Sequence, residues 1–341
     1  MKVEQVKNCI FSEWYQTFSA VTVKSVAIPL PQDVVRYLLA DGIVLPEGSD
    51  HGCCNNNKNC HSDSDDDEIN WDNNATSGRT ALVPKFSPEF ENRVESALKK
   101  LGGAVFPKLN WSAPKDAAWV ATGNTLQCRS LGDILLLLKS SDFVAHDLTV
   151  PFERCTDIGE DLNDDRTAAR YELVLRKWTT IAQSSEFRCF VKNGKIIAIS
   201  QRYFAVYFPF LLADKTRIVD DIVKFHRAAI GGRFRDDAYA MDVYRRDDGS
   251  VRLLDFNPFG ETTDSLLFDW TELRESDADS EPEFRCVERE SGVQPNEFHP
   301  YAVPKDFVDL SRGEDPFKLM DLMKLREASA EASDSSSDEE E

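Results

Sequence analysis

The chain has 341 residues, of which 41% are hydrophobic and 29% are charged, and its formal net charge is −20 at pH 7. This length can bury one large or two medium hydrophobic cores, so we expect a two-lobed α/β protein rather than a small scaffold. The acidity argues against general nucleic-acid binding, and the longest apolar run, residues 134–138, is far shorter than the roughly 20 residues that cross a bilayer.

Strands and helices are expected to alternate irregularly along the chain. The apolar periods and the turn residues between them predict strands at residues 25–30, 104–109 and 171–178, helices at 31–39, 88–101, 130–138 and 214–227, and two hairpins, 186–201 and 242–256. The first hairpin turns at Asn193-Gly194 and the second at Asp247-Asp248-Gly249, and both turns favour antiparallel pairing. The predicted class is therefore α+β with largely antiparallel sheets.

This order of elements suggests a division into lobes. We expect the first lobe to comprise residues 1–49 and 78–170, which include a phosphate-side loop, and a nucleotide-binding lobe to comprise residues 171–273. Residues 274–325 are expected to dock on this body as a C-terminal segment, in which Phe307 and Leu310 follow Pro304. Residues 326–341 are expected to form a disordered acidic tail, whose serines could accept phosphate.

Residues 50–77 are rich in Asn, Asp and Ser, and we expect them to form a disordered loop. Zinc is not expected at Cys53, Cys54, Cys60 and His61, because adjacent cysteines do not easily share a tetrahedral site and no second Cys-x-x-Cys pair follows. The N-terminus lacks the apolar region of a secretory signal, and the eight cysteines lack framework spacing, which predicts a cytoplasmic protein with reduced thiols. We expect a monomer.

The second hairpin carries acids where the apolar alternation does not expect them. Two paired strands can bring Asp242, Asp255 and the amide oxygen of Asn257 to one point. Hard oxygen donors of this kind suit Mg²⁺, with nucleotide phosphates as the remaining ligands. The alternative is that the acids form structural ion pairs with nearby arginines, and the hairpin alone does not decide between the two. The arginines closest in sequence are Arg245, Arg246 and Arg252.

Three further segments offer groups that a bound triphosphate needs. Lys108 ends a strand and precedes Asn110-Trp-Ser-Ala-Pro-Lys-Asp116, a loop that could bring N–H groups and a lysine to phosphates, although it lacks Walker A spacing. The second segment, Arg176-Lys177-Trp178, closes a buried strand against which a purine could stack. In the third, Glu186, Arg188 and Phe190 share one strand face, where Arg188 could bind phosphate bidentately and Arg202 could join it.

Each segment also has an ordinary structural explanation. A lysine at a strand end is usually solvated, Glu-x-Arg on a strand face is usually a cross-strand pair, and a tryptophan is usually a core residue. The occurrence of four such segments in one chain favours a nucleotide site.

Six longer motifs of the chain resemble those of a known protein family. They are Phe106-Pro-Lys-Leu-Asn-Trp-Ser-Ala-Pro114, Glu172-Leu-Val-Leu-Arg-Lys-Trp178, Glu186-Phe-Arg-Cys-Phe-Val191, Ser200-Gln-Arg202, Asp255-Phe-Asn-Pro-Phe-Gly-Glu-Thr-Thr-Asp-Ser-Leu-Leu-Phe268 and Pro304-Lys-Asp-Phe-Val-Asp-Leu310. Together they resemble the cell division cycle protein 123 family over nearly the whole chain, starting at Phe11-Ser-Glu-Trp-Tyr15.

The resemblance implies an ATP-grasp-like fold, in which two α+β lobes clamp Mg-ATP between antiparallel sheets. It also implies an assembly chaperone of eukaryotic translation initiation factor 2 that binds the gamma subunit and so supports translation initiation and the cell cycle.

The resemblance also implies roles for single residues. Lys108 would hold phosphate, and the loop of Ser112, Ala113, Pro114, Lys115 and Asp116 would cover it. Arg176, Lys177 and Trp178 would form the adenine-side hinge, with Glu186, Arg188 and Arg202 around ribose and phosphates, and Asp242, Asp255 and Asn257 would ligate Mg²⁺. The glycine-rich cover loop of ATP-grasp enzymes is replaced here by Ser-Ala-Pro-Lys-Asp, which leaves the mobility of the cover open.

Two functions from different classes remain. In the first, ATP is a structural ligand of a binding protein without catalytic residues. In the second, the chain is a ligase that forms an acylphosphate on a carboxylate substrate. The sequence shows no clear clamp for a second substrate, and the resemblance favours the first.

Overall fold

The computed structural model describes residues 1–40, 42, 45, 84–121, 123–158 and 171–292. The expectations for the loop at residues 50–77, for the cysteines within it, for Phe307 and Leu310, and for the acidic tail lie outside these residues.

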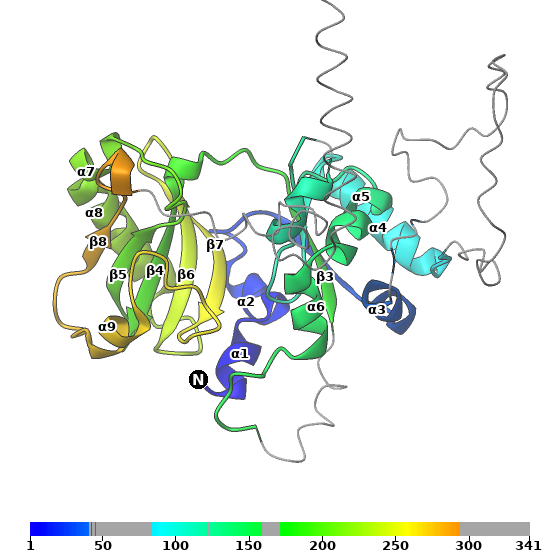
Figure 1. Cartoon of the computed structure of the whole chain (residues 1–341), viewed down its shortest axis with the longest axis horizontal. Helices are drawn as coiled ribbons and strands as arrows, with labels where there is room; N and C mark the ends of the chain where they lie inside the picture. Colours follow the sequence, from blue (N-terminus) through cyan, green and yellow to red (C-terminus); the bar gives the residue numbers. More distant parts are fainter. Residues whose placement is uncertain (41, 43–44, 46–83, 122, 159–170, 293–341) are drawn as a thin grey trace, which may run out of the picture. The chain divides into compact units, whose positions relative to one another are not determined.

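The described chain contains two β-sheets (Figure 1). One has three antiparallel strands in the order β1-β3-β2: β1 (Ser25–Pro29), β2 (Val105–Lys108) and β3 (Glu172–Lys177). The other has five strands in the order β7-β6-β4-β5-β8: β4 (Glu186–Lys192), β5 (Lys195–Gln201), β6 (Tyr239–Arg245), β7 (Val251–Pro258) and β8 (Glu283–Arg285). Among the strand pairs of the described residues, only β5–β8 is parallel. The predicted α+β class with largely antiparallel sheets is confirmed.

Helices cover the three-stranded sheet and share its core. They are α3 (Gln32–Leu39), α4 (Pro88–Leu101), α5 (Leu131–Lys139) and α6 (Asp142–Thr149), with the 3₁₀ segment η1 (Lys115–Val120). The predicted limits of α4 are confirmed, because Ser87 Oγ accepts a hydrogen bond from Phe90 N–H and Gly102 ends the helix at φ 95°. Helix α6 was not predicted from the sequence.

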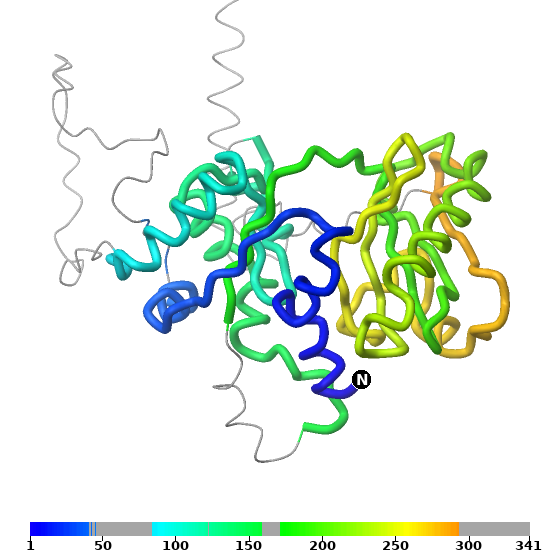
Figure 2. Tube along the Cα trace, turned by 180° about the vertical axis from the view of Figure 1, so that it is seen from behind, coloured from blue at the N-terminus to red at the C-terminus, as the bar shows by residue number. Residues whose placement is uncertain are grey.

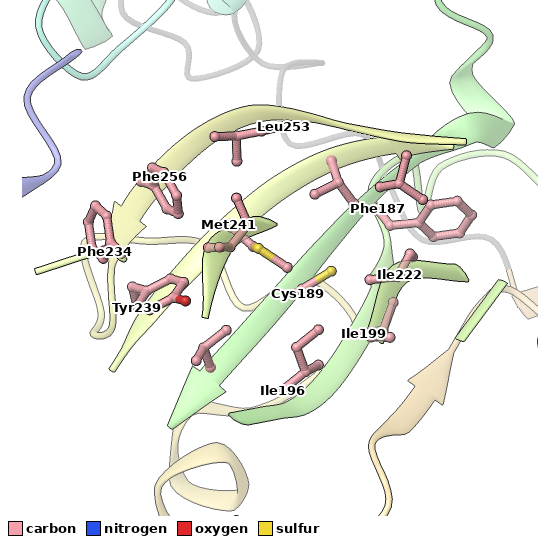
Figure 3. Packing of buried hydrophobic residues seen from close by; sticks show 14 of the residues in the cluster. Phe187, Cys189, Ile196, Ile199, Ile222, Phe234, Tyr239, Met241, Leu253 and Phe256 are labelled. Atoms are coloured by element: carbon pink, nitrogen blue, oxygen red, sulfur yellow. The ribbon is translucent and has the colours of Figure 1, made fainter. Parts of the chain in front are cut away.

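The five-stranded sheet has its own core, which fills one of its faces (Figure 3). Side chains such as Phe187, Met241 and Phe256 point to this face and belong to the same cluster as Ile222. Ile222 belongs to α8 (Lys215–Phe225), which follows α7 (Phe210–Ala213) and continues as a π-helical turn, η4 (His226–Ile230). On the other face, a smaller cluster of Phe190, Phe268 and Leu273 includes α9 (Trp270–Glu275). The described residues also contain the short 3₁₀ turns η3 (Gln183–Ser185) and η5 (Glu290–Gly292).

The N-terminal residues contribute to both cores, and Figure 2 traces their path in blue. Two helices that were not predicted, α1 (Val3–Asn8) and α2 (Phe11–Phe18), precede β1. Phe11, Trp14 and Phe18 of α2 pack in the core of the five-stranded sheet, and the rings of Trp14 and Phe256 meet edge to face at 5.3 Å. The described residues before β1 thus pack with the five-stranded sheet, whereas Ile28 of β1 and Val34 of α3 pack with the three-stranded sheet.

Two predicted boundaries separate strands that belong to the same sheet. A division at residue 171 would separate β3 from its partners β1 and β2, although β3 is the central strand of their sheet. In the expected docking segment, β8 extends the five-stranded sheet.

The predicted hairpins are confirmed. In the β4–β5 turn, Asn193 has φ 52° and Gly194 φ 70°, the left-handed pair that a type I′ turn requires. Gly249 in the β6–β7 turn has φ 81°. Within the described ranges, every helix is too short or too polar to cross a bilayer.

Candidate functional site

A row of polar residues crosses the five-stranded sheet on the face opposite its main core. The register places Asp255 of β7 opposite Asp242 of β6, Asp242 opposite Arg188 of β4, and Arg188 opposite Ser200 of β5. Directly paired residues share a face, so these side chains lie next to one another. Asn257 is on the same face, two residues after Asp255. The structure thus brings the three predicted magnesium ligands together.

A β-bulge places Asp255 in this row. Between Asp242 and Val243 the register shifts, so that Val243 pairs with Leu253 and Leu254 is the extra residue. Leu253 then points into the core while Asp255 and Asn257 point to the polar face. The apolar pair Leu253-Leu254 interrupts the alternation of β7, and this interruption was the sequence signal for the bulge.

Asp242 is held by Arg188. The guanidinium donates from Nε to Asp242 Oδ1 at 2.7 Å and from Nη2 to Oδ2 at 2.8 Å, and its Nη1 donates to the carbonyl oxygen of Asp264 at 2.8 Å. Burial alone would raise the pKa of Asp242, but the charge and hydrogen bonds of Arg188, with Arg202 and Lys115 nearby, hold it well below its usual value. Asp242 is therefore a carboxylate at neutral pH.

Asp255 meets a lysine from the other sheet. Lys108 ends β2, its side chain is 1% exposed, and its Nζ donates to Asp255 Oδ2. The same ammonium lies 5.9 Å from the ring centre of Phe11. The arginines of the alternative reading have other partners. Arg245 pairs with Asp221, Arg246 donates to Tyr244 Oη, and Arg252 donates to the carbonyl oxygen of Ala20.

The loop after β2 brings a second lysine to the site. Burial and the charge of Arg202 lower the pKa of Lys115 to about 8, although Glu186 and Asp242 nearby raise it. Burial raises the pKa of Glu186, although Lys115 and Arg202 lower it. Lys115, Glu186 and Arg202 are therefore close enough to interact, as the prediction of one shared site requires.

The remaining residues of this loop are held by α6. Ser112 donates from its N–H and its Oγ to Asp147, and Ala113 and Pro114 connect it to Lys115. The carboxylate of Asp116 accepts from Ser141 Oγ and from the N–H groups of Asp142 and Phe143, at the start of α6. Asp116 thus lies beside the predicted phosphate ligands, but its oxygens bind the helix.

The expected adenine-side segment lies at the end of β3. The buried Arg176 donates to the carbonyl oxygen of Leu254, the bulge residue, at 2.6 Å and to Thr22 Oγ1 at 3.3 Å. Lys177 is exposed. Trp178 is half-buried, and its backbone N–H donates a hydrogen bond to the carbonyl oxygen of Ala104. Arg176 therefore connects the two sheets, while Lys177 and Trp178 begin the segment that leads to β4.

The charges of the site fit a magnesium nucleotide. Four cations surround three acids: Lys108, Lys115, Arg188 and Arg202 around Glu186, Asp242 and Asp255. The surplus positive charge and the low pKa of Lys115 favour an anionic ligand. Over the described ranges, no three His, Cys, Asp or Glu side chains are placed to hold a metal, so a cation here would also need the amide oxygen of Asn257 and phosphate oxygens.

Three polar residues of this region were missed in the sequence. Tyr203 hydrogen-bonds Glu186, and burial together with the charge of Glu186 raises the pKa of Tyr203 to about 12. Asp147 accepts a hydrogen bond from the Ser112 N–H, and the carbonyl oxygen of Asp264 accepts one from Arg188. Tyr203 follows Arg202 directly, a proximity that could have indicated it, whereas Asp147 had no signal without the helix that carries it.

A model of the family described as D123 matches residues 14–311. The translation initiation factor eIF2 assembly protein of Xenopus laevis is 46% identical over 337 residues, which cover 95% of this chain and 97% of that protein. Cell division cycle protein 123 of Yarrowia lipolytica is 39% identical over 285 residues, which cover 81% of this chain and 70% of that protein. Among solved structures, C-terminally truncated Cdc123 of Schizosaccharomyces pombe is similar with a TM-score of 0.67 and 35% identity, covering 85% of this chain and 99% of that chain.

The family match, the full-length relatives and the shared fold agree with the motifs that suggested this kinship, and the chain belongs to the D123 family.

Proposed function

We propose that the chain binds Mg-ATP at the polar row. We also propose that it assists the assembly of eukaryotic translation initiation factor 2, the function that the names of its relatives give for those proteins. The observation that carries the nucleotide part is the placement of Asp242, Asp255 and Asn257 on one sheet face, next to Arg188 and to Lys108 from the other sheet.

Each group has a distinct task in this proposal. Asp242, Asp255 and Asn257 hold Mg²⁺, which supplies charge neutralisation for the phosphates. Lys108, Lys115, Arg188 and Arg202 bind phosphate oxygens, with Glu186 at the ribose, and Arg176, Lys177 and Trp178 border the adenine side. Ser112 and Ala113 offer backbone groups, and Asp116 supports their loop.

Nucleotide would then act as a structural ligand. Lys108 belongs to the three-stranded sheet and Asp255 to the five-stranded sheet, so a ligand bound by both adds to the contacts that join the sheets. A ligand that binds only the folded form stabilises it by mass action. We propose that this stabilised form is the one that binds the partner.

Lys115 gives the site a pH dependence. Phosphate favours the ammonium form of Lys115, and this form is lost in the free protein as the pH rises through about 8. We expect calorimetric titrations to show ATP affinity that depends on Mg²⁺ and falls between about pH 7 and about pH 9, with proton uptake at the higher value. The Lys115→Met variant should bind more weakly and lose the proton uptake. Equal uptake by this variant would show that another group titrates.

The partner we propose is the gamma subunit of initiation factor 2, bound in the cytoplasm by the monomeric chain. The net charge of −20 suits a basic face on the partner, so the association should weaken as salt rises. Pull-downs with separate alpha, beta and gamma subunits over a salt series test this. Capture of gamma alone, reduced by salt, is expected, and capture that is indifferent to salt or specific for another subunit would contradict it.

The release of phosphate from ATP distinguishes this proposal from the ligase alternative. If nucleotide is a structural ligand, phosphate release should remain at background both with and without the gamma subunit. Phosphate release above background would favour the ligase.

A further inference from the structure

The loop between β2 and η1 is fixed at three places. Asn110 is fully buried, and its Oδ1 accepts the N–H of Glu172 on β3 at 2.8 Å, while its carbonyl oxygen accepts the N–H of Phe11. Ser112 binds Asp147 with its N–H at 2.8 Å and its Oγ at 2.9 Å. Asp116 receives three hydrogen bonds from the start of α6.

Two of these anchors belong to one helix. Asp147 lies near the end of α6, and the groups that bind Asp116 lie at its start. Only Ala113, Pro114 and Lys115 separate Ser112 from Asp116. Pro114 restricts the backbone further, and no glycine occurs between Ala104 and Ala121. A segment held and composed in this way has few conformations open to it.

Asp147 contributes to the site only through this loop and its charge. The residue is 4% exposed, and both of its carboxylate oxygens accept hydrogen bonds from Ser112. Burial raises the pKa of Asp147 to about 6, although the bonds from Ser112 and the charges of Lys108 and His146 lower it, so the group is ionised at neutral pH.

We propose that Asp147 is a positioning residue that, together with Asp116, fixes the loop of residues 112–116 on α6 and holds Lys115 in place before nucleotide arrives. The cover of the phosphate site is then preformed, unlike a mobile glycine-rich flap. This inference rests on the proposed nucleotide binding for its consequence, but the fixing of the loop is a property of the free protein.

Two substitutions separate hydrogen bonding from charge. In Asp147→Asn, the amide oxygen can accept from the Ser112 N–H while the amide nitrogen donates to Ser112 Oγ, so both bonds persist without the charge. Asp147→Leu fills a similar volume and removes both bonds. Asp142→Asn is the matched control, because Asp142 is an exposed residue of the same helix.

Hydrogen exchange of the nucleotide-free protein tests the loop directly. In the parent, the amides of residues 109–117 should be protected, and Mg-ATP should change their exchange little. In Asp147→Leu, they should exchange at least about ten-fold faster, because both hydrogen bonds from Ser112 to the carboxylate are lost. Asp147→Asn and Asp142→Asn should match the parent. Fast exchange in the free parent that slows only with Mg-ATP would overturn the preformed cover.

Affinities for ATP and AMP test the consequence at neutral pH. Asp147→Leu should weaken ATP binding about ten-fold and AMP binding much less, since the loop lies on the phosphate side, whereas a general loss of structure would weaken both equally. Asp147→Asn should bind ATP as the parent does, and a loss as large as that of the Leu variant would overturn positioning in favour of charge. If the parent binds no Mg-ATP while Asp147→Leu still exchanges faster, the proposed function fails and the fixing of the loop stands. Parent-like exchange and ATP affinity in Asp147→Leu overturn the role of Asp147.

Discussion

Replacing Asp255 by alanine is expected to abolish Mg-ATP binding and to destabilise the protein. The substitution removes a predicted metal ligand and leaves the ammonium of Lys108, 1% exposed, without its carboxylate partner. Breaking a buried ion pair costs about 3–5 kcal/mol, and we expect about 3 kcal/mol because the Asp255 side chain remains 18% exposed. Denaturant unfolding measures the stability and calorimetry the affinity.

Two controls separate the ligand role of Asp255 from its structural role. Asp247→Ala changes an exposed acid in the turn of the same hairpin and should alter stability by less than about 0.5 kcal/mol. The double variant Lys108→Met, Asp255→Asn removes both charges, so it should recover much of the lost stability but not the ATP affinity. If Asp255→Ala binds ATP as tightly as the parent, the acids of the hairpin serve only as ion-pair partners.

Replacing Phe256 by alanine is expected to give the largest loss of stability. Phe256 lies between the two metal-ligand candidates of β7 but points into the opposite face of the sheet (Figure 3). Its ring stacks on Phe234 at 4.1 Å and contacts Trp14, Phe18 and Tyr239. Truncating a buried phenylalanine costs about 3–5 kcal/mol, so the melting temperature should fall strongly.

The comparison variants for Phe256 test whether the effect comes from packing. Phe256→Leu keeps most of the volume and should cost about 1 kcal/mol. Phe210→Ala removes a ring that is 51% exposed and should be nearly neutral. If Phe256→Ala lowers the melting temperature only slightly, the packing of α2 on the sheet does not depend on the Phe256 ring.

Much of the fold could be predicted because its signals are local. Ser87 and Gly102 mark the ends of α4, and Asn193-Gly194 specifies its turn without reference to the rest of the chain. The helices α2 and α6 were missed because eight residues give a weak periodic pattern and, unlike α3 of the same length, neither follows a proline that marks its start.

The relative positions of the candidate site residues could be predicted to a similar extent. The acids of β6 and β7 and Arg188 share a face by simple alternation and strand pairing, which the sequence displays. The approach of Lys108 to Asp255 joins residues 147 positions apart, and no local pattern specifies such a contact. Asp116 has the residue type of a ligand, but its partners at the start of α6 are visible only in three dimensions.

A structure of the chain with Mg²⁺ and ATP tests the central claim most directly. We predict one Mg²⁺ bound by oxygens of Asp242, Asp255 and Asn257, with the phosphates on Lys108, Lys115, Arg188 and Arg202. ATP bound elsewhere, or Asp242 and Asp255 still paired with Arg188 and Lys108 at saturating Mg-ATP with no metal between them, would contradict it.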